Sequence, residues 1–117
     1  MLEDGPAAGR YSVRRAPYLM RAVGHASGHT DLLDQLNDEP LETELVYVYE
    51  AIPGTIVDWS QHRDWIICPP PGASGRYRHR PDVDGETLRT TAAWRAWARA
   101  QPTADPVVDG VTGEARP

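Results

Sequence analysis

The sequence predicts a small single domain of the α+β class, with a mainly antiparallel sheet of four or five strands covered by a helix near the C-terminal end. Short segments rich in β-branched and aromatic residues alternate with turns that contain Pro and Gly, which is typical of antiparallel strands. A later segment, 85–100, repeats apolar residues at helical spacing. A chain of 117 residues has room for one such domain.

Five segments have the composition of strands. The clearest is 45–52, and the Pro53 and Gly54 that follow it suit a tight turn into 55–60. The continuous apolar run 65–68 indicates a strand that is buried on both faces. The expected strands lie near 11–15, 45–52, 55–60, 65–68 and 76–80, with a break or bulge at Pro17 after the first.

Two segments predict helices. The short segment 30–37 begins at Thr30, a residue that commonly caps helix N-termini. The longer segment, 85–100, follows Asp82 and Asp84, either of which suits its N-cap. Its apolar stripe at helical spacing consists of Leu88, Thr91, Trp94 and Trp97 with Ala98.

The tryptophans of that stripe are the predicted centre of the core, because each buries a large area. We expect Trp94 and Trp97 to pack on Tyr47, Tyr49, Ile56 or Trp65 of the sheet.

The two ends of the chain differ in composition from its middle. Residues 1–9 are rich in Gly, Pro and Ala and predict a flexible leader. Residues 103–117 are rich in Pro, Gly and acids and predict a disordered acidic tail. The domain is therefore expected to occupy 10–102.

Composition restricts the chemistry and the compartment. Lysine is absent, which excludes a Schiff-base nucleophile and a P-loop lysine. The single cysteine, Cys68, cannot form an internal disulfide and fits a reducing compartment. Without a secretory signal or a long apolar segment, the chain is expected to be soluble and cytoplasmic, with no membrane partner. Abundant Arg, Ala, Gly and Pro indicate a GC-rich genome, bacterial or phage.

Charge is segregated along the chain, whose net charge is −5. No arginine lies between Arg21 and Arg63, and that stretch carries acids throughout. Such blocks either pair within the fold or present opposite poles to partners.

No residue cluster specifies catalysis or a metal. His25, His29, His62 and Cys68 have the side chains of a tetrahedral site, but no pair has the compact spacing of zinc motifs. Ser27 lies in Gly-x-x-Ser-Gly, which differs from a nucleophile elbow. We therefore expect no metal and no cofactor, and we identify no catalytic residue.

The segment 75–80 is the most distinctive one. As a strand it places its arginines on one face, which suits phosphate contacts, and an aromatic row on the other, which suits base stacking. The alternative is an edge strand whose arginines pair with Glu44 and Glu50. The candidate binding residues are Arg76, Tyr77, Arg78, His79 and Arg80, with His62 and Arg63 nearby in sequence.

Three hypotheses of function follow. The first is a non-enzymatic protein-binding or regulatory accessory module, such as a phage or bacterial inhibitor or adaptor. The second is a small enzyme or ligand-binding domain that uses His, Cys and Arg in a pocket. The third is a nucleic-acid-binding module, which the net acidity disfavours. Missing catalytic motifs favour the first, with another protein as partner, and the oligomeric state is left open, a homodimer included.

Overall fold

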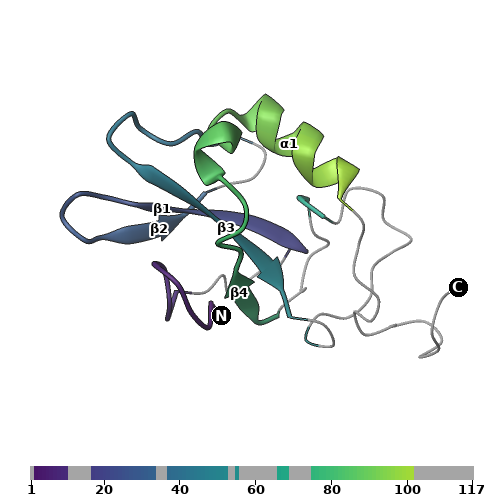
Figure 1. The fold of residues 1–117 in the computed structure, drawn as a ribbon, viewed down its shortest axis with the longest axis horizontal. Coiled ribbons are helices and arrows are strands. Elements are labelled where there is room, and N and C mark those ends of the chain that lie inside the picture. The colour runs from purple at the N-terminus through teal and green to yellow at the C-terminus, as the bar shows by residue number, and fades with distance from the viewer. Residues whose placement is uncertain are drawn as a thin grey trace, which may run out of the picture.

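The computed structural model describes residues 2–10, 17–33, 37–52, 55, 66–68 and 75–101. The elements in chain order are β1 (Leu19–Gly24), β2 (Thr30–Leu32), β3 (Leu45–Ala51), β4 (Tyr77–His79), the 3₁₀ helix η1 (Gly85–Leu88) and the α-helix α1 (Thr91–Ala100). The strands form one antiparallel sheet in the order β2-β1-β3-β4 (Figure 1). This architecture is consistent with the predicted α+β class. No helix in these ranges is long and apolar enough to cross a membrane.

β1 and β3 form the centre of the sheet. They pair from Leu19 opposite Glu50 to Gly24 opposite Leu45. Every residue of β1 is buried, which requires cover on both faces of the strand. The expected strands 45–52 and 76–80 are confirmed as β3 and β4, each slightly shorter than predicted.

The first predicted strand, 11–15, and most of the predicted strand 55–60 lie outside the described residues. The first described strand is β1, which begins shortly after Pro17. The last residues of β3 pair with β1 on one side and with β4 on the other.

The predicted helix 30–37 is wrong, because Thr30–Leu32 form strand β2. A turn over 25–28 reverses the chain: Gly28 has φ +91° and its N–H donates to the His25 carbonyl at 2.9 Å. β2 then pairs antiparallel with β1, with Leu32 opposite Ala22. Pairing with a strand already in the sheet overrides the capping propensity of Thr30, which is a local and weak preference.

The apolar run 65–68 is not a strand in its described part. Residues 66–68 form a turn, although Ile66 and Ile67 belong to the buried core. The Ile66 carbonyl accepts a hydrogen bond from the N–H of Leu19 at 3.1 Å. An apolar run indicates that a segment is buried, but here the buried segment is a turn and not an extended strand.

The predicted single helix 85–100 is two helices. Asp84 caps η1 by accepting from the N–H of Glu86, as expected, and Thr90 caps α1 by accepting from the N–H of Ala93. Thr90 itself is extended, with ψ 148°, so the helix cannot run through it. The cap at Thr90 therefore divides this segment into two helices, although its apolar periodicity alone predicts one.

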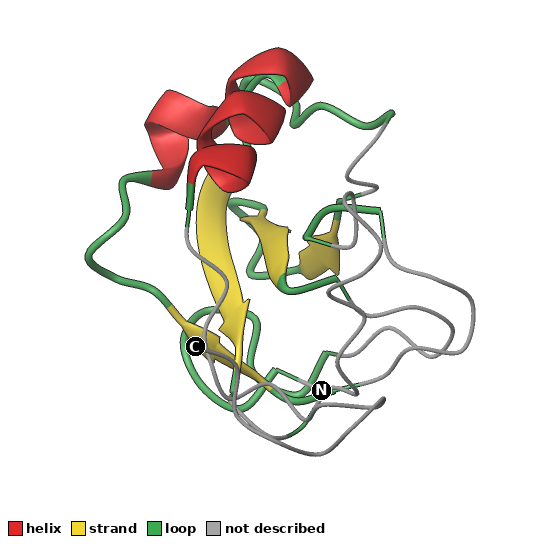
Figure 2. Ribbon diagram, turned by 90° about the vertical axis from the view of Figure 1, so that its right-hand side faces the viewer, coloured by secondary structure: helices red, strands yellow, loops and turns green. Residues whose placement is uncertain are grey.

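The helices cover one face of the sheet, the helix-covered face (Figure 2). Gly85 lies against the carbonyl of Val46 in β3. Trp94 of α1 is fully buried, and the guanidinium of Arg21 lies 5.3 Å from its ring centroid. Arg21 is opposite Val48 in the register, so these residues share the face that meets α1 and η1.

Arg21 connects this face to two loops. The buried guanidinium donates to the carbonyls of Leu88 at 2.9 Å, Arg89 at 3.0 Å and Asp38 at 3.1 Å. Two of these carbonyls lie where η1 ends, so Arg21 satisfies acceptors that the break between the helices exposes. Burial lowers the pKa of Arg21 to about 10.

Tyr47 and Tyr49 point to the opposite face, the tyrosine face, because side chains alternate along β3. The expected packing of the Trp94 and Trp97 stripe on these tyrosines is therefore wrong in its direction. Trp94 is instead buried on the valine side of β3, with half-buried Trp97 stacked on it at 5.5 Å between ring centroids. Ile56 and Trp65 lie outside the described residues.

We expected a flexible leader over residues 1–9, but residues 2–10 are packed on β4 and on the tyrosine face. Leu2 is buried and bridges to Tyr77. The Tyr49 hydroxyl donates to the Asp4 carbonyl at 2.7 Å and accepts from the N–H of Ala7 at 2.9 Å. The predicted tail 103–117 lies outside the described residues.

Carboxylates cover three outward N–H groups of the strands. Each accepts a hydrogen bond from a backbone N–H that does not pair with a neighbouring strand, so these positions are not free to pair with another chain. The pairs are Leu32 with Asp31 (2.8 Å), Val46 with Glu86 (2.9 Å) and His79 with Asp4 (2.7 Å).

Candidate functional site

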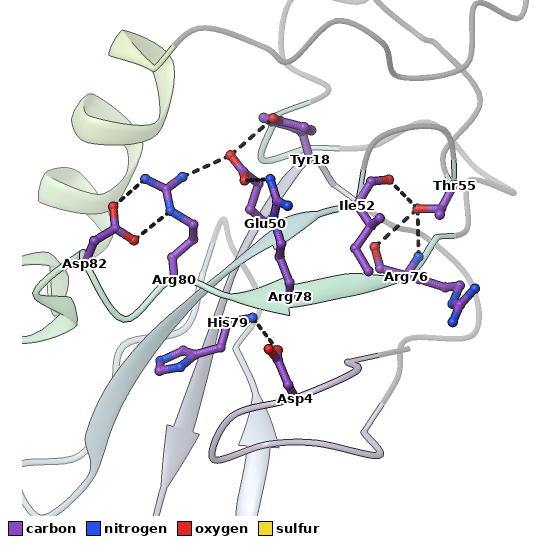
Figure 3. A network of polar contacts seen from close by, with 10 residues as sticks. All are labelled: Asp4, Tyr18, Glu50, Ile52, Thr55, Arg76, Arg78, His79, Arg80 and Asp82. Atoms are coloured by element: carbon purple, nitrogen blue, oxygen red, sulfur yellow. Dashed lines mark hydrogen bonds and ion pairs between the residues drawn. The ribbon is translucent and has the colours of Figure 1, made fainter.

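The predicted arginine row of β4 is paired with carboxylates (Figure 3). Arg78 binds Glu50 at 3.1 Å, and Arg80 binds the other oxygen of Glu50 at 2.9 Å. Arg80 also binds Asp82 through two hydrogen bonds, of 2.9 and 2.8 Å. Tyr18 completes the network by donating its hydroxyl to Glu50 at 3.2 Å.

The remaining predicted residues of the row have separate roles. Arg76 pairs with Glu3 at 2.7 Å, and this pairing lowers the pKa of Glu3. Tyr77 is buried, its hydroxyl donates to the carbonyl of Pro17, and burial raises its pKa. Its ring is buried in the core, so neither face of the ring is accessible for stacking on a nucleic-acid base. His62 and Arg63 lie outside the described residues.

Charge in the row is therefore matched. Three guanidinium groups, of Arg76, Arg78 and Arg80, contact the three carboxylates of Glu3, Glu50 and Asp82. The hydrogen bonds with Arg80 lower the pKa of Asp82 to about 2, so this carboxylate is ionised at any working pH. A row neutralised in this way has little charge left for phosphates, which supports the edge-strand alternative.

The histidines that we considered as metal ligands form a different arrangement. His25 Nε2 lies 2.8 Å from Glu44, a carboxylate that we expected to pair with the arginines of 76–80. The His29 ring lies 5.2 Å from that of His25, and its Nδ1 contacts Arg10 at 3.3 Å. Cys68 is half-buried. The described residues contain no group of three or more His, Cys, Asp or Glu side chains that suits a metal ion.

The tyrosine face carries a first hollow beside the β1–β2 turn. It has a volume of about 410 Å³, and Tyr47 and Leu45 of β3 form one side. Gly24, opposite Leu45, leaves room for the Tyr47 ring, because a Cβ there would lie only 3.0 Å from that ring. The described lining is Pro6, Gly24, His25, Ala26, Gly28, Thr30, Thr43, Leu45 and Tyr47.

A second hollow, of about 450 Å³, lies on the other side of Tyr47. Its aromatic walls are Tyr47 and His79, with ring centroids 6.0 Å apart and planes at 76°. The described lining is Val46, Tyr47, His79, Pro81, Asp82, Val83, Asp84 and Gly85. Tyr47 belongs to both hollows, so the two linings meet at this residue.

Sequence reasoning identified His79 and placed Tyr47 in the core, but it did not recognise the surface that they form. The usable signal was the alternation of β3, which separates Tyr47 from the valines. The sequence did not indicate that Leu45 would be exposed, because its 55% exposure depends on tertiary packing.

No protein-family model matches the chain, and neither the curated proteins nor the solved structures include a significant match. The geometry of this surface is therefore the basis for inferring a function.

Proposed function

We propose that the protein is a non-enzymatic protein-binding module that docks a segment of its partner across Tyr47 on the tyrosine face. The observation that carries the proposal is that two hollows meet at this one half-buried aromatic residue. An extended segment with two anchoring side chains fits such a surface, with one anchor on each side of the ring.

The exposure of Leu45 supports the same surface. Its side chain is 55% exposed although it belongs to the central strand pair and lines the first hollow. An aromatic ring beside an exposed aliphatic side chain is the composition expected at the centre of a protein interface.

The carboxylates that accept hydrogen bonds from outward strand N–H groups favour recognition through side chains over addition of a partner strand to the sheet. Because Asp31, Glu86 and Asp4 already accept from these groups, a partner strand would have to displace them before it could join the sheet. We infer a reducing, cytoplasmic setting for this binding, which the lone Cys68 suits.

Selection of a displayed random peptide library on the purified chain tests the proposal. Selected peptides should shift NMR signals around Leu45 and Tyr47, and Tyr47→Ala should weaken their binding by about tenfold or more. Leu45→Ala should also weaken binding, and Leu41→Ala is its matched control, because Leu41 is 63% exposed and lines neither hollow. Peptides that map elsewhere, or that tolerate Tyr47→Ala in a folded protein, would contradict it.

A small-molecule site in the first hollow is the second candidate, and the His25–Glu44 pair favours it. Glu44 is nearly buried and fixes the imidazole at the rim of the hollow. In a metabolite library screen by thermal shift, a hit that depends on His25 and is indifferent to Leu45→Ala would favour this candidate.

A further inference from the structure

The second hollow has the side chains of a cation site. Tyr47 and His79 present rings that stand nearly perpendicular, at 76°, on two sides of one hollow. The other side of His79 packs on the Tyr49 ring at 5.4 Å, and this contact holds the imidazole in place. Two rings at such an angle let a cation contact one ring face while the second ring closes the side.

Acidic groups complete the lining. Asp82 and Asp84 line the hollow, and no arginine is among the described lining residues. The charge of Asp82 is already matched by Arg80, so Asp84 is the carboxylate of this lining that is left to attract a cation. Asp84 is fixed by its cap on η1 and makes no ion pair in the described part of the chain.

The apolar lining residues have a place in the same scheme. Pro81, Val83 and Gly85 offer carbon surface between the carboxylates and the rings. Long basic side chains bury their aliphatic stems on such surface while the charged head contacts polar groups.

We propose that this hollow binds a cationic side chain, arginine or lysine, from a basic segment of the partner. The proposal rests on the proposed function and adds the charge of the partner to it. Cation–π contact with Tyr47 and attraction to Asp84 supply the recognition. The excess of acids between Arg21 and Arg63, and the net charge of −5, attract such a segment at longer range.

The test is an NMR titration with three blocked amino acid amides: arginine, lysine and neutral citrulline, which matches arginine in shape. The arginine and lysine amides should shift the ring signals of Tyr47 and His79 saturably, and citrulline should not. Equal shifts with citrulline, or shifts that map to another surface, would overturn the proposal.

Two variants test the contributing groups. Tyr47→Leu removes the ring and should weaken binding of the arginine amide by about three- to thirty-fold. Asp84→Asn keeps the N-cap of η1 and removes the charge, with an expected loss of about two- to five-fold. Glu42→Gln is its control, because it removes an exposed charge outside the lining and should leave binding unchanged.

The two proposals fail separately. Selected peptides that bind across Tyr47 but tolerate replacement of each basic residue by citrulline or glutamine would refute the cation site alone. A saturable arginine shift without any peptide binding across Tyr47 would refute the docking proposal alone.

Discussion

The two faces of the sheet are covered by very different means. On the helix-covered face, η1 and α1 close over the valines of β3, and even Arg21 is buried under Trp94. On the tyrosine face, residues 2–10 cover Tyr49 but leave Tyr47 half-buried between two hollows. In the described part of the chain, both faces thus contribute buried core residues, but the cover of the tyrosine face is incomplete around Tyr47.

Burial changes from one residue to the next within strand β3. Val48 is fully buried on the helix-covered face, whereas its neighbour Tyr47 is half-buried and lines both hollows. Substitutions on the helix-covered face should therefore change stability, and those around Tyr47 should mainly change binding.

The largest effect is expected for Trp94→Ala, which removes the central side chain of the helix-covered face. The cavity and the lost contact with Arg21 should reduce the free energy of unfolding by about 3–5 kcal/mol. Urea denaturation measures this loss. Trp94→Phe keeps a ring over Arg21 and should lose clearly less, and a loss below about 1 kcal/mol for the alanine variant would show that this face is not the core.

Paired glycine substitutions compare the two faces directly. A Cβ on Gly85 would lie 2.2 Å from the Val46 carbonyl oxygen, and the backbone cannot yield cheaply, so Gly85→Ala should cost about 2–3 kcal/mol. A Cβ on Gly24 would lie 3.0 Å from the Tyr47 ring, which can rotate aside. Gly24→Ala should cost less in thermal denaturation, and equal losses would contradict the contrast between the faces.

A smaller effect is expected for Tyr49→Phe, which tests how residues 2–10 are held. Without the hydroxyl, the Asp4 carbonyl and the Ala7 N–H lose their partner, at a cost of about 1–2 kcal/mol. Amide hydrogen exchange in 2–10 should accelerate more than exchange in β1. Unchanged exchange at Ala7 would show that other contacts hold this segment.

The smallest effect concerns the ion pair of Asp82. Because its pKa in the folded protein is about 2, below the ordinary value of 3.8, the pair stabilises the fold above about pH 4 and the contribution is lost as the pH falls toward 2. NMR titration of the Asp82 carboxyl should give a midpoint near 2. In Arg80→Gln the midpoint should rise toward 3.8, and a midpoint that stays near 2 would assign the shift to another group.

Local patterns predicted the elements that depend on local chemistry. The composition of β3 and β4, the cap at Asp84 and the helical spacing around Trp94 all report the immediate neighbourhood of each residue. The alternation of β4 likewise separated Arg78 and Arg80 from Tyr77, and pairing with Glu50 was anticipated as one alternative.

The rest depends on contacts that are distant in sequence. Thr30 is a residue type that commonly caps helices, but its segment pairs with β1 and is therefore the strand β2. The break at Thr90 exposes carbonyls that are satisfied by Arg21, which is distant in sequence. The surface around Tyr47 combines residues from 6 to 85, and no local pattern brings these together.

The carboxylates at the strand N–H groups give the molecule an unusual chemical vulnerability. In a chain without lysine, amine-directed reagents have no side-chain target, whereas carbodiimide-driven amidation would convert Asp4, Asp31 and Glu86 into neutral amides. The amide oxygens can still accept from the strand N–H groups, but without the negative charge these hydrogen bonds are weaker. Amidated protein should therefore pair through its strand edges more readily than protein treated with amine-directed reagents.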